Sequence, residues 1–159
     1  MLKQNHNIFL IFILFFILAT LTSAFIIQYV LGHQPCNLCL YERAPYIIST
    51  FLIINILFFK KYVKTTLFIL FLVFFASAIL SFYHFGIEQD IFSESNICGA
   101  NNLEILKKEE ILKELVEKNI SCKDADFKIF GLSLATFNII FSVILSVIFA
   151  RLFINYGKN

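Results

Sequence analysis

Four cysteines are the residues of this chain whose type and spacing are best suited to covalent chemistry: Cys36, Cys39, Cys98 and Cys122. Cys36 and Cys39 form a Cys-x-x-Cys pair, and a disulfide between them closes so short a loop that it stabilises the fold little. Such tight pairs are more often redox-active than structural. The sequence therefore predicts thiol–disulfide exchange at this pair.

The pairing of four cysteines has three possible connectivities, and position along the chain suggests Cys36–Cys39 and Cys98–Cys122. Two alternatives to redox chemistry stay open. The cysteines could form inert structural disulfides, or their four sulfur atoms could hold a structural zinc ion. The 23 residues between Cys98 and Cys122 do not match the usual zinc-knuckle spacing, so we expect no metal ion.

Arg43 is the cation nearest to the Cys-x-x-Cys pair. Pro35 favours a helix that begins within residues 36–41, and Cys39 near that N-terminus would have a lowered pKa. On a continuous helix Arg43 shares the face of Cys39 one turn deeper, where it could stabilise a thiolate or bind a quinone carbonyl. The alternative is an interfacial anchor with its charged end in water, paired with Glu42.

The elements that position these residues are long apolar segments. Hydrophobic residues make up 59% of the 159 residues and charged residues 15%, which is not the composition of a soluble domain. Crossing the hydrocarbon core takes about 20 helical residues, and backbone polar groups in lipid must be satisfied within the segment. We therefore predict an all-α membrane protein, a single domain over residues 1–159 with four transmembrane helices. Their approximate ranges are 8–31, 41–59, 65–85 and 131–154, with outer loops at 32–40 and 86–130.

The first apolar segment has an alternative interpretation as a cleaved signal peptide, because Lys3 precedes it and Ala24 follows small residues. The apolar stretch is long for a signal peptide and continues past Ala24 to Ile27. We expect a retained helix.

The distribution of Lys and Arg sets the expected orientation. With four crossings both termini lie on the side of the connection between the second and third helices. That side carries six cations and no acid, all in short segments beside helix ends, which is typical of the cytoplasmic side. We expect a multi-pass protein of the bacterial inner membrane, with cytoplasmic termini and all four cysteines in periplasmic loops. The six cations are Lys3, Lys60, Lys61, Lys64, Arg151 and Lys158.

Residues 34–43, which read QPCNLCLYER, closely resemble the DsbB family of disulfide bond formation proteins. That family is a four-helix inner-membrane bundle with a Cys-x-x-Cys before its second helix and a second cysteine pair between helices three and four. Residues 130–138 (FGLSLATFN) resemble the start of the family's last helix, and residues 83–88 (YHFGIE) resemble a motif of some branches. The resemblance covers essentially the whole chain.

The resemblance implies a quinone-dependent thiol:disulfide oxidoreductase that uses ubiquinone or menaquinone. It implies that a periplasmic DsbA-like carrier of thioredoxin fold attacks Cys98, and that the released Cys122 attacks Cys36 in a Cys36–Cys39 disulfide. Cys39 is then left as a thiolate facing the quinone, with Arg43 stabilising the negative charge. The expected partners are this carrier, membrane lipid and the quinone, and no nucleic acid.

Two other functions are weighed against this one. A relative of vitamin K epoxide reductase is also a four-helix thiol enzyme that uses quinones, but its two cysteine pairs occur in the reverse order. A membrane scaffold would use its disulfides only to hold its outer loops together. Replacing Cys39 by Ser separates a scaffold from an oxidase, because only the oxidase would lose its function.

Two further features have both a functional and a structural interpretation. His84 lies at the outer end of the third helix and is a candidate for the quinone site, although a histidine there is more often an interfacial residue. Residues 104–119 form an amphipathic stretch that either lies on the membrane surface or packs as a solvated helix on the bundle. His33, next to the redox loop, is a weaker candidate.

Overall fold

The computed structural model describes residues 2–59, 62–93, 98, 122, 128–129 and 131–156. The predicted amphipathic stretch 104–119, most of the second outer loop and Lys60, Lys61 and Lys158 lie outside these residues. The described helices in chain order are α1 (Leu2–Tyr29), α2 (Asn37–Tyr41), α3 (Ala44–Phe58), α4 (Val63–Glu88) and α6 (Leu134–Tyr156).

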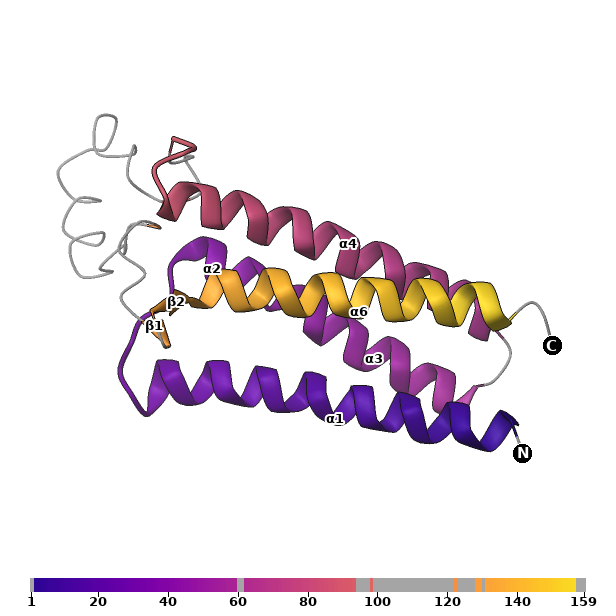
Figure 1. Ribbon diagram of the computed structural model, residues 1–159. Coiled ribbons are helices and arrows are strands. Elements are labelled where there is room, and N and C mark those ends of the chain that lie inside the picture. The colour runs from indigo at the N-terminus through magenta and orange to yellow at the C-terminus, as the bar shows by residue number, and fades with distance from the viewer. Residues whose placement is uncertain are drawn as a thin grey trace, which may run out of the picture.

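Four of these helices, α1, α3, α4 and α6, run side by side along the molecule, and both termini lie at the same end (Figure 1). The connection from α1 to α2 and the short hairpin before α6 lie at the opposite end (Figure 1). Helix α4 packs along α6, while α3 contacts both α1 and α4. This up-and-down arrangement keeps the segments that carry the cysteines at one end of the bundle.

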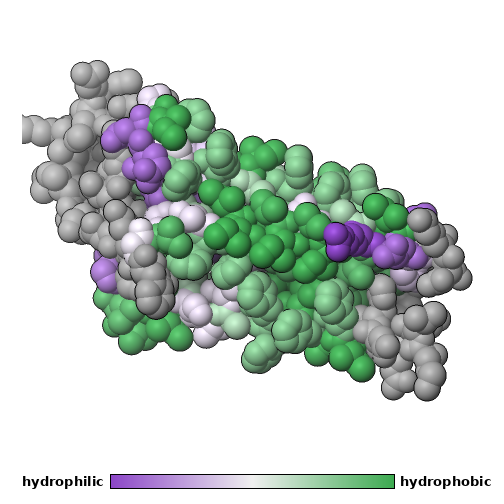
Figure 2. Space-filling view, in the orientation of Figure 1, coloured by the Kyte–Doolittle hydropathy of each residue, from purple (hydrophilic) through white to green (hydrophobic). Residues whose placement is uncertain are grey.

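Three of the helices are long and apolar enough to cross a membrane: residues Asn7–Tyr29, Val63–Glu88 and Leu134–Tyr156. They correspond to the predicted segments 8–31, 65–85 and 131–154, with ends shifted by a few residues. Large hydrophobic side chains stay exposed along them, as Phe12, Phe15 and Ile79 show. Figure 2 shows hydrophobic side chains across the middle of the molecule and hydrophilic ones toward its two ends. A surface of this kind is stable in lipid and not in water.

The predicted second span, residues 41–59, differs from the structure. The chain forms a five-residue helix α2, turns at Glu42 and Arg43, and begins a new 15-residue helix α3 at Ala44. Pro45 explains the break: in a continuous helix its ring would clash with the carbonyl four residues earlier and its missing N–H would cost a hydrogen bond, whereas both are tolerated in a first turn. The fourth crossing of the membrane, by α3, stays a prediction.

The last span also begins later than predicted, because residues before it form a small antiparallel hairpin. Strands β1 (Lys128–Ile129) and β2 (Leu132–Ser133) pair with Ile129 opposite Leu132. Gly131, in the two-residue turn between them, has φ of 81°, a conformation that other residues adopt only with strain. The fold is therefore all-helical apart from this hairpin.

The bundle core has an apolar part and a polar part. At the apolar part Phe74 of α4 stacks on Phe149 of α6, with ring centroids 5.7 Å apart. Nearer the cysteine end, Ser77 and Ser142 share a hydrogen bond of 3.0 Å, and the Asn138 amide donates to Ser81 at 2.7 Å. Small hydroxyl residues let two helices approach closely and satisfy each other's polar groups, which is typical of helix pairs in membranes.

Candidate functional site

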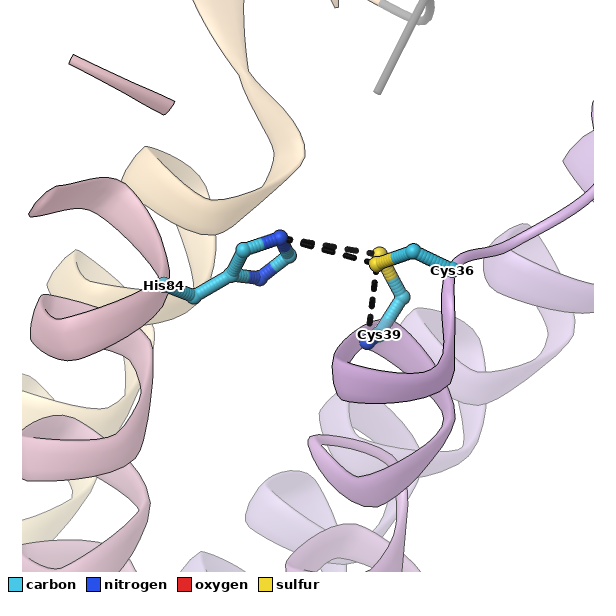
Figure 3. A group of neighbouring side chains, drawn as sticks. All are labelled: Cys36, Cys39 and His84. Atoms are coloured by element: carbon cyan, nitrogen blue, oxygen red, sulfur yellow. Dashed lines mark hydrogen bonds between the residues drawn. The ribbon is translucent and has the colours of Figure 1, made fainter. Parts of the chain in front are cut away.

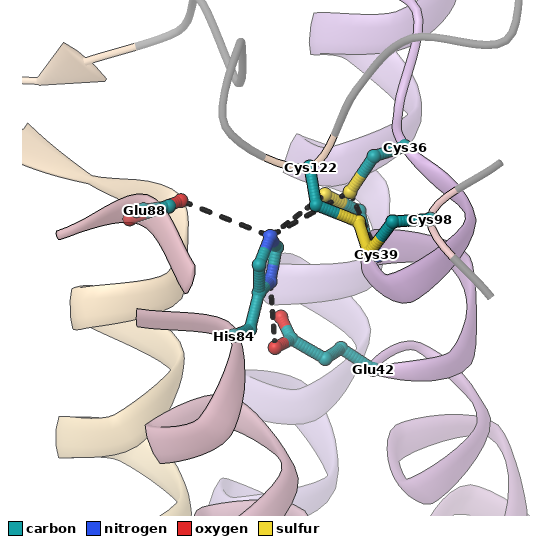
Figure 4. The surroundings of a disulfide bond; sticks show 7 residues. All are labelled: Cys36, Cys39, Glu42, His84, Glu88, Cys98 and Cys122. Atoms are coloured by element: carbon teal, nitrogen blue, oxygen red, sulfur yellow. Dashed lines mark hydrogen bonds and ion pairs between the residues drawn. A yellow bond between two sulfur atoms is a disulfide. The ribbon is translucent and has the colours of Figure 1, made fainter. Parts of the chain in front are cut away.

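The four cysteines converge in one buried cluster at the end of the bundle. Cys36, Cys98 and Cys122 are buried there together with Leu38 and Ile87, and the partly exposed Cys39 packs against them. Cys98 and Cys122 form a disulfide with Cα atoms 5.5 Å apart, whereas Cys36 and Cys39 are free thiols (Figure 4). The structure thus holds one oxidised and one reduced pair in contact with a shared apolar environment.

Cys36 is the N-cap residue of α2. Its sulfur atom accepts a hydrogen bond from the backbone N–H of Cys39 at 3.2 Å. Pro35 precedes it, and the extended conformation of Cys36, with ψ of 164°, is the one that an N-cap requires. The two-residue spacing of the Cys-x-x-Cys motif therefore places the Cys39 N–H directly at the sulfur of Cys36.

The ring of His84, in the last turns of α4, lies beside both thiols. Its Nε2 atom is 3.6 Å from Cys36 Sγ and 4.0 Å from Cys39 Sγ (Figure 3). His84 is 1% exposed, which is unusually low for a histidine. The alternative placement of His84, with its polar tip in the head groups, is not observed, because its ring is buried and directed at the sulfur atoms. The candidacy of His84 for the quinone site stays a prediction.

Two carboxylates flank the same imidazole on different sides (Figure 4). Glu42 Oε1 lies 3.0 Å from His84 Nδ1 and accepts its N–H, while Glu88 Oε1 lies 3.8 Å from His84 Nε2. Both carboxylate side chains are more than nine-tenths buried. In the described part of the chain neither oxygen of Glu88 has a hydrogen-bond partner. A buried carboxyl group without a partner is costly and commonly marks a functional site.

The two thiols of the Cys-x-x-Cys pair differ sharply in pKa. The hydrogen bond from the Cys39 side chain lowers the pKa of Cys36 to about 5, and the hydrogen bond and charge of His84 act in the same direction against the effect of burial. The same side-chain hydrogen bond to Cys36, together with burial, raises the pKa of Cys39 well above its usual range. Cys36 is therefore the thiolate of the reduced pair, and Cys39 keeps the shared proton.

This assignment reverses the prediction that Cys39 has the lowered thiol pKa. The helix begins at Asn37, within the predicted range 36–41, but the cap position belongs to Cys36 and not to Cys39. The sulfur at the cap position accepts the backbone N–H of Cys39, and His84 Nε2 lies nearer to it than to the sulfur of Cys39. Position relative to the cap decides which of the two thiols ionises.

Arg43 lies in the turn between α2 and α3, so the helix that carries Cys39 ends before Arg43 and is not continuous with α3. Its Nη1 donates a hydrogen bond to Gln28 Oε1, and its guanidinium lies over the ring of Phe25, 5.3 Å from the centroid. The described contacts of Arg43 are thus with α1. The alternative pairing of Arg43 with Glu42 is also not observed, because Glu42 pairs with His84.

The sequence analysis missed Glu42 and Glu88 as site residues. Both are acids within otherwise apolar segments, and Glu88 follows His84 by four residues, a spacing that places two side chains on one helix face. Those two signals could have identified the pair of acids. His33, the weaker candidate, is exposed.

The site has two cysteine pairs in different redox states, next to an imidazole with two carboxylate neighbours. It lies at the end of an apolar helix bundle. These features are typical of a membrane thiol–disulfide oxidoreductase. Comparison with known families gives the same class. Residues 6–152 match the family of disulfide bond formation protein DsbB, and the chain belongs to that family. It is therefore a membrane protein of disulfide bond formation, and the family implies thiol oxidase activity.

The chain is also similar to the uncharacterized protein RP370 of Rickettsia prowazekii (strain Madrid E). The two are 29% identical over 160 residues, which covers 99% of this chain and 92% of that protein. The similarity therefore extends through the whole bundle and through the segments that carry the two cysteine pairs.

The ionisation of Cys36 gives a direct test of this site. With the Cys36–Cys39 pair reduced and the Cys98–Cys122 disulfide intact, we expect the ultraviolet absorbance of one thiolate to appear with a midpoint near pH 5, since the pKa of Cys36 is lowered to about 5. An unperturbed thiol titrates at about 8.5. Replacing His84 by Gln removes a hydrogen bond and a charge that lower this pKa, so the midpoint should move upward.

The exposed His33 offers the matched control, and His33→Gln should leave the titration unchanged. A single thiolate that appears only above about pH 8 in the unmodified protein would contradict the assignment of Cys36.

Proposed function

We propose that this chain is an inner-membrane protein-disulfide oxidase that reoxidises a periplasmic, DsbA-like dithiol carrier of thioredoxin fold and passes the electrons to a membrane quinone, either ubiquinone or menaquinone. The observation that carries the proposal is the burial of two cysteine pairs in one cluster, one pair oxidised and one reduced. A scaffold has no need to bring its two pairs together or to leave one of them reduced beside an imidazole.

The exchange begins with both pairs oxidised. A carrier thiolate attacks Cys98, which breaks the Cys98–Cys122 bond and forms a mixed disulfide, and the released Cys122 attacks Cys36 and frees Cys39. The second carrier thiol then releases the oxidised carrier and Cys98, and Cys98 attacks Cys122 to free Cys36. Two electrons and two protons have moved from the carrier to Cys36 and Cys39.

The product of that sequence is a Cys98–Cys122 disulfide beside a reduced Cys36–Cys39 pair. This is the redox pattern of the structure, which supports the proposed order. Cys36 and Cys122 share the same buried cluster, so the exchange between the pairs needs little rearrangement. Cys98 is only 2% exposed, and attack by a carrier therefore requires the Cys98 sulfur to become accessible first.

The residues around Arg43 fit a quinone. Arg43 is half-buried at the cysteine end of the bundle, and its hydrogen bond to Gln28 uses Nη1. A guanidinium has about five N–H donors, so it can donate to a second acceptor. Phe25 lies under it and stacks on Tyr29, with centroids 6.2 Å apart, and both rings are exposed on α1. In our proposal Arg43 donates to a carbonyl and the two rings contact the apolar part.

A quinone bound there supplies the acceptor for two electrons. The residues of the chain handle the protons. Closing the Cys36–Cys39 disulfide releases the proton that the two thiols share, and His84 Nε2 faces both sulfur atoms at 3.6 and 4.0 Å. Glu42 at Nδ1 fixes the orientation of the ring and stabilises it when both nitrogens carry protons.

The proposed orientation of the protein in the membrane follows from the difference between the two ends of the bundle. The cysteine site lies at the end of the bundle opposite to both termini (Figure 1). The cations Lys64 and Arg151 lie near the terminal end, which we assign to the cytoplasm because positive charge beside helix ends is retained there. The site then faces the periplasm, where thiols are oxidised.

Two alternatives are less well supported. Membership of the DsbB family favours the oxidase over a relative of vitamin K epoxide reductase. A structural zinc site of four thiolates is incompatible with the Cys98–Cys122 disulfide.

The decisive experiment measures quinone reduction by the purified protein, supplied with a reduced DsbA-like carrier. We expect Cys39→Ser to lower the rate by about a thousandfold or more, because the electrons can no longer leave as a disulfide. The variant should still form a mixed disulfide with the carrier. A scaffold would keep its partner oxidised in this variant, and that result would exclude the proposed function.

The role of Arg43 predicts a change in quinone affinity and not in thiol exchange. Losing a charged hydrogen bond costs about 1.5–3 kcal/mol, so Arg43→Gln should raise the KM for quinone by about 10- to 100-fold, and Arg43→Lys should restore part of the affinity. The rate of exchange with the carrier should stay unchanged. Arg151→Gln, at the other end of the bundle, is the control. An unaltered KM in Arg43→Gln would remove Arg43 from the quinone site.

The orientation is tested by fusions. Green fluorescent protein joined after Asn159 should fluoresce in cells, because it folds in the cytoplasm. Alkaline phosphatase at the same position should be inactive, because it becomes active only in the periplasm. Alkaline phosphatase joined after Ser93, beyond the end of α4, should be active. The opposite pattern would place the cysteines in the cytoplasm and would be incompatible with oxidation of a periplasmic carrier.

A further inference from the structure

Three atoms that bind soft metal ions converge in the reduced site. The sulfur atoms of Cys36 and Cys39 and a ring nitrogen of His84 all lie within 4.8 Å of one another (Figure 3). Cys36 and His84 are buried, and Cys39 is partly buried. Two thiolates and an imidazole are the ligands that zinc and its heavier relatives prefer.

The distances match tetrahedral coordination. Zinc–sulfur bonds of about 2.3 Å and zinc–nitrogen bonds of about 2.0–2.1 Å place a sulfur and a nitrogen ligand about 3.6 Å apart on one ion. His84 Nε2 lies 3.6 Å from Cys36 Sγ and 4.0 Å from Cys39 Sγ. One ion could therefore contact the ring nitrogen and both sulfur atoms, which all lie within 4.8 Å of one another.

The surroundings of His84 complete the arrangement that a metal-binding histidine usually has. Its Nδ1–H donates to Glu42 Oε1 at 3.0 Å, so Nε2 is the ring nitrogen directed at the two sulfur atoms, and it can bind a cation once its own proton has left. A carboxylate behind the ligating histidine fixes the tautomer and raises the basicity of the ring.

Glu88 is a carboxylate beside this site and not one of its ligands. Its Oε1 lies 3.8 Å from His84 Nε2, on the side of the ring away from the sulfur atoms (Figure 4). The Glu88 side chain is 7% exposed, and its two oxygens have no hydrogen-bond partner in the described residues. A cation bound to the three ligand atoms would offset the charge of this buried carboxylate.

We propose that the reduced Cys36–Cys39 pair, together with His84, binds one thiophilic divalent cation of the Zn²⁺ and Cd²⁺ class. Binding displaces to solvent the proton that the two thiols share and the Nε2 proton of a protonated His84, and it leaves two metal-bound thiolates and a neutral imidazole. The Cys36–Cys39 disulfide cannot form while both sulfurs ligate the ion, so binding arrests the chain in its reduced state. The metal site itself does not depend on the proposed oxidase function, and only the arrest of turnover does.

This site differs from the zinc site that the sequence analysis weighed, which used all four cysteines. It also revises the expectation of no metal ion, because that expectation considered the spacing of Cys98 and Cys122 and not a contact between the first pair and His84. The Cys98–Cys122 disulfide stays intact in the proposed complex.

The test compares two redox forms of the unmodified full-length protein in detergent, so it needs no variant. We expect CdCl₂ to give a thiolate-to-cadmium absorption band that saturates at one ion per chain when the Cys36–Cys39 pair is reduced. The fully oxidised protein should show no band and at least about 100-fold weaker binding. Equal binding by both forms, or no binding by the reduced form, would overturn the proposal.

Substitutions then assign the ligands. His84→Gln should weaken Cd²⁺ binding by at least tenfold, and Glu42→Gln by about 10- to 100-fold through its hydrogen bond to the ring. Glu88→Gln should weaken binding, and the exposed His33→Gln should not. A fully reduced Cys98→Ala, Cys122→Ala variant should keep the site, which separates it from a four-cysteine site.

A protection experiment remains decisive if a substitution impairs folding. In the unmodified reduced protein Cd²⁺ should protect Cys36 and Cys39 from maleimide, as read by peptide mass mapping. Failure of Cd²⁺ to protect these two cysteines would exclude the site whatever the variants show. Cd²⁺ binding without inhibition of quinone reduction would instead count against the oxidase function and leave the metal site in place.

Discussion

The hydrogen bond between His84 Nδ1 and Glu42 Oε1, 3.0 Å long, joins α4 to the turn between α2 and α3 and holds the site together. Burial of an imidazole is costly unless both ring nitrogens find partners. With Nδ1 committed to Glu42, the only orientation of the ring points Nε2 at the sulfur atoms of the Cys-x-x-Cys pair. The position of the thiols relative to α4 thus depends on this polar contact.

Pro45 lies just after the point where the helix is interrupted. Helix α2 ends at Tyr41 and α3 begins at Ala44, and the two charged residues Glu42 and Arg43 form the turn between them. Glu42 can then turn toward α4 while Arg43 turns toward Gln28 and Phe25 on α1. Two adjacent charged residues serve opposite sides of the bundle: one orients the imidazole and the other faces the lipid edge.

The sequence was sufficient for the features that depend on local composition. The three long spans follow from runs of apolar residues, and the importance of the four cysteines follows from their type and spacing. The sequence was insufficient where contacts join distant segments. His84 and Cys36 are 48 residues apart, and nothing in the composition of either segment indicates that an imidazole reaches the thiols. The helix break was predictable from Pro45, which the search for apolar runs passed over because proline does not interrupt hydrophobicity.

The two cysteine pairs have unequal environments, and this inequality bears on the direction of exchange. Cys36 accepts hydrogen bonds from the Cys39 backbone and lies beside His84, so its thiolate form is stabilised and it is a good leaving group when a disulfide to it is broken. The described neighbours of Cys98 and Cys122 in the buried cluster include Ile87 and Leu38, whose side chains offer a thiolate no hydrogen bond. A thiolate is therefore more stable in the Cys36–Cys39 pair, and a disulfide bond is more stable in the Cys98–Cys122 pair. Electrons that enter at Cys98 and Cys122 move toward Cys36 and Cys39 because the reduced form of the latter pair is the one that the surrounding residues stabilise.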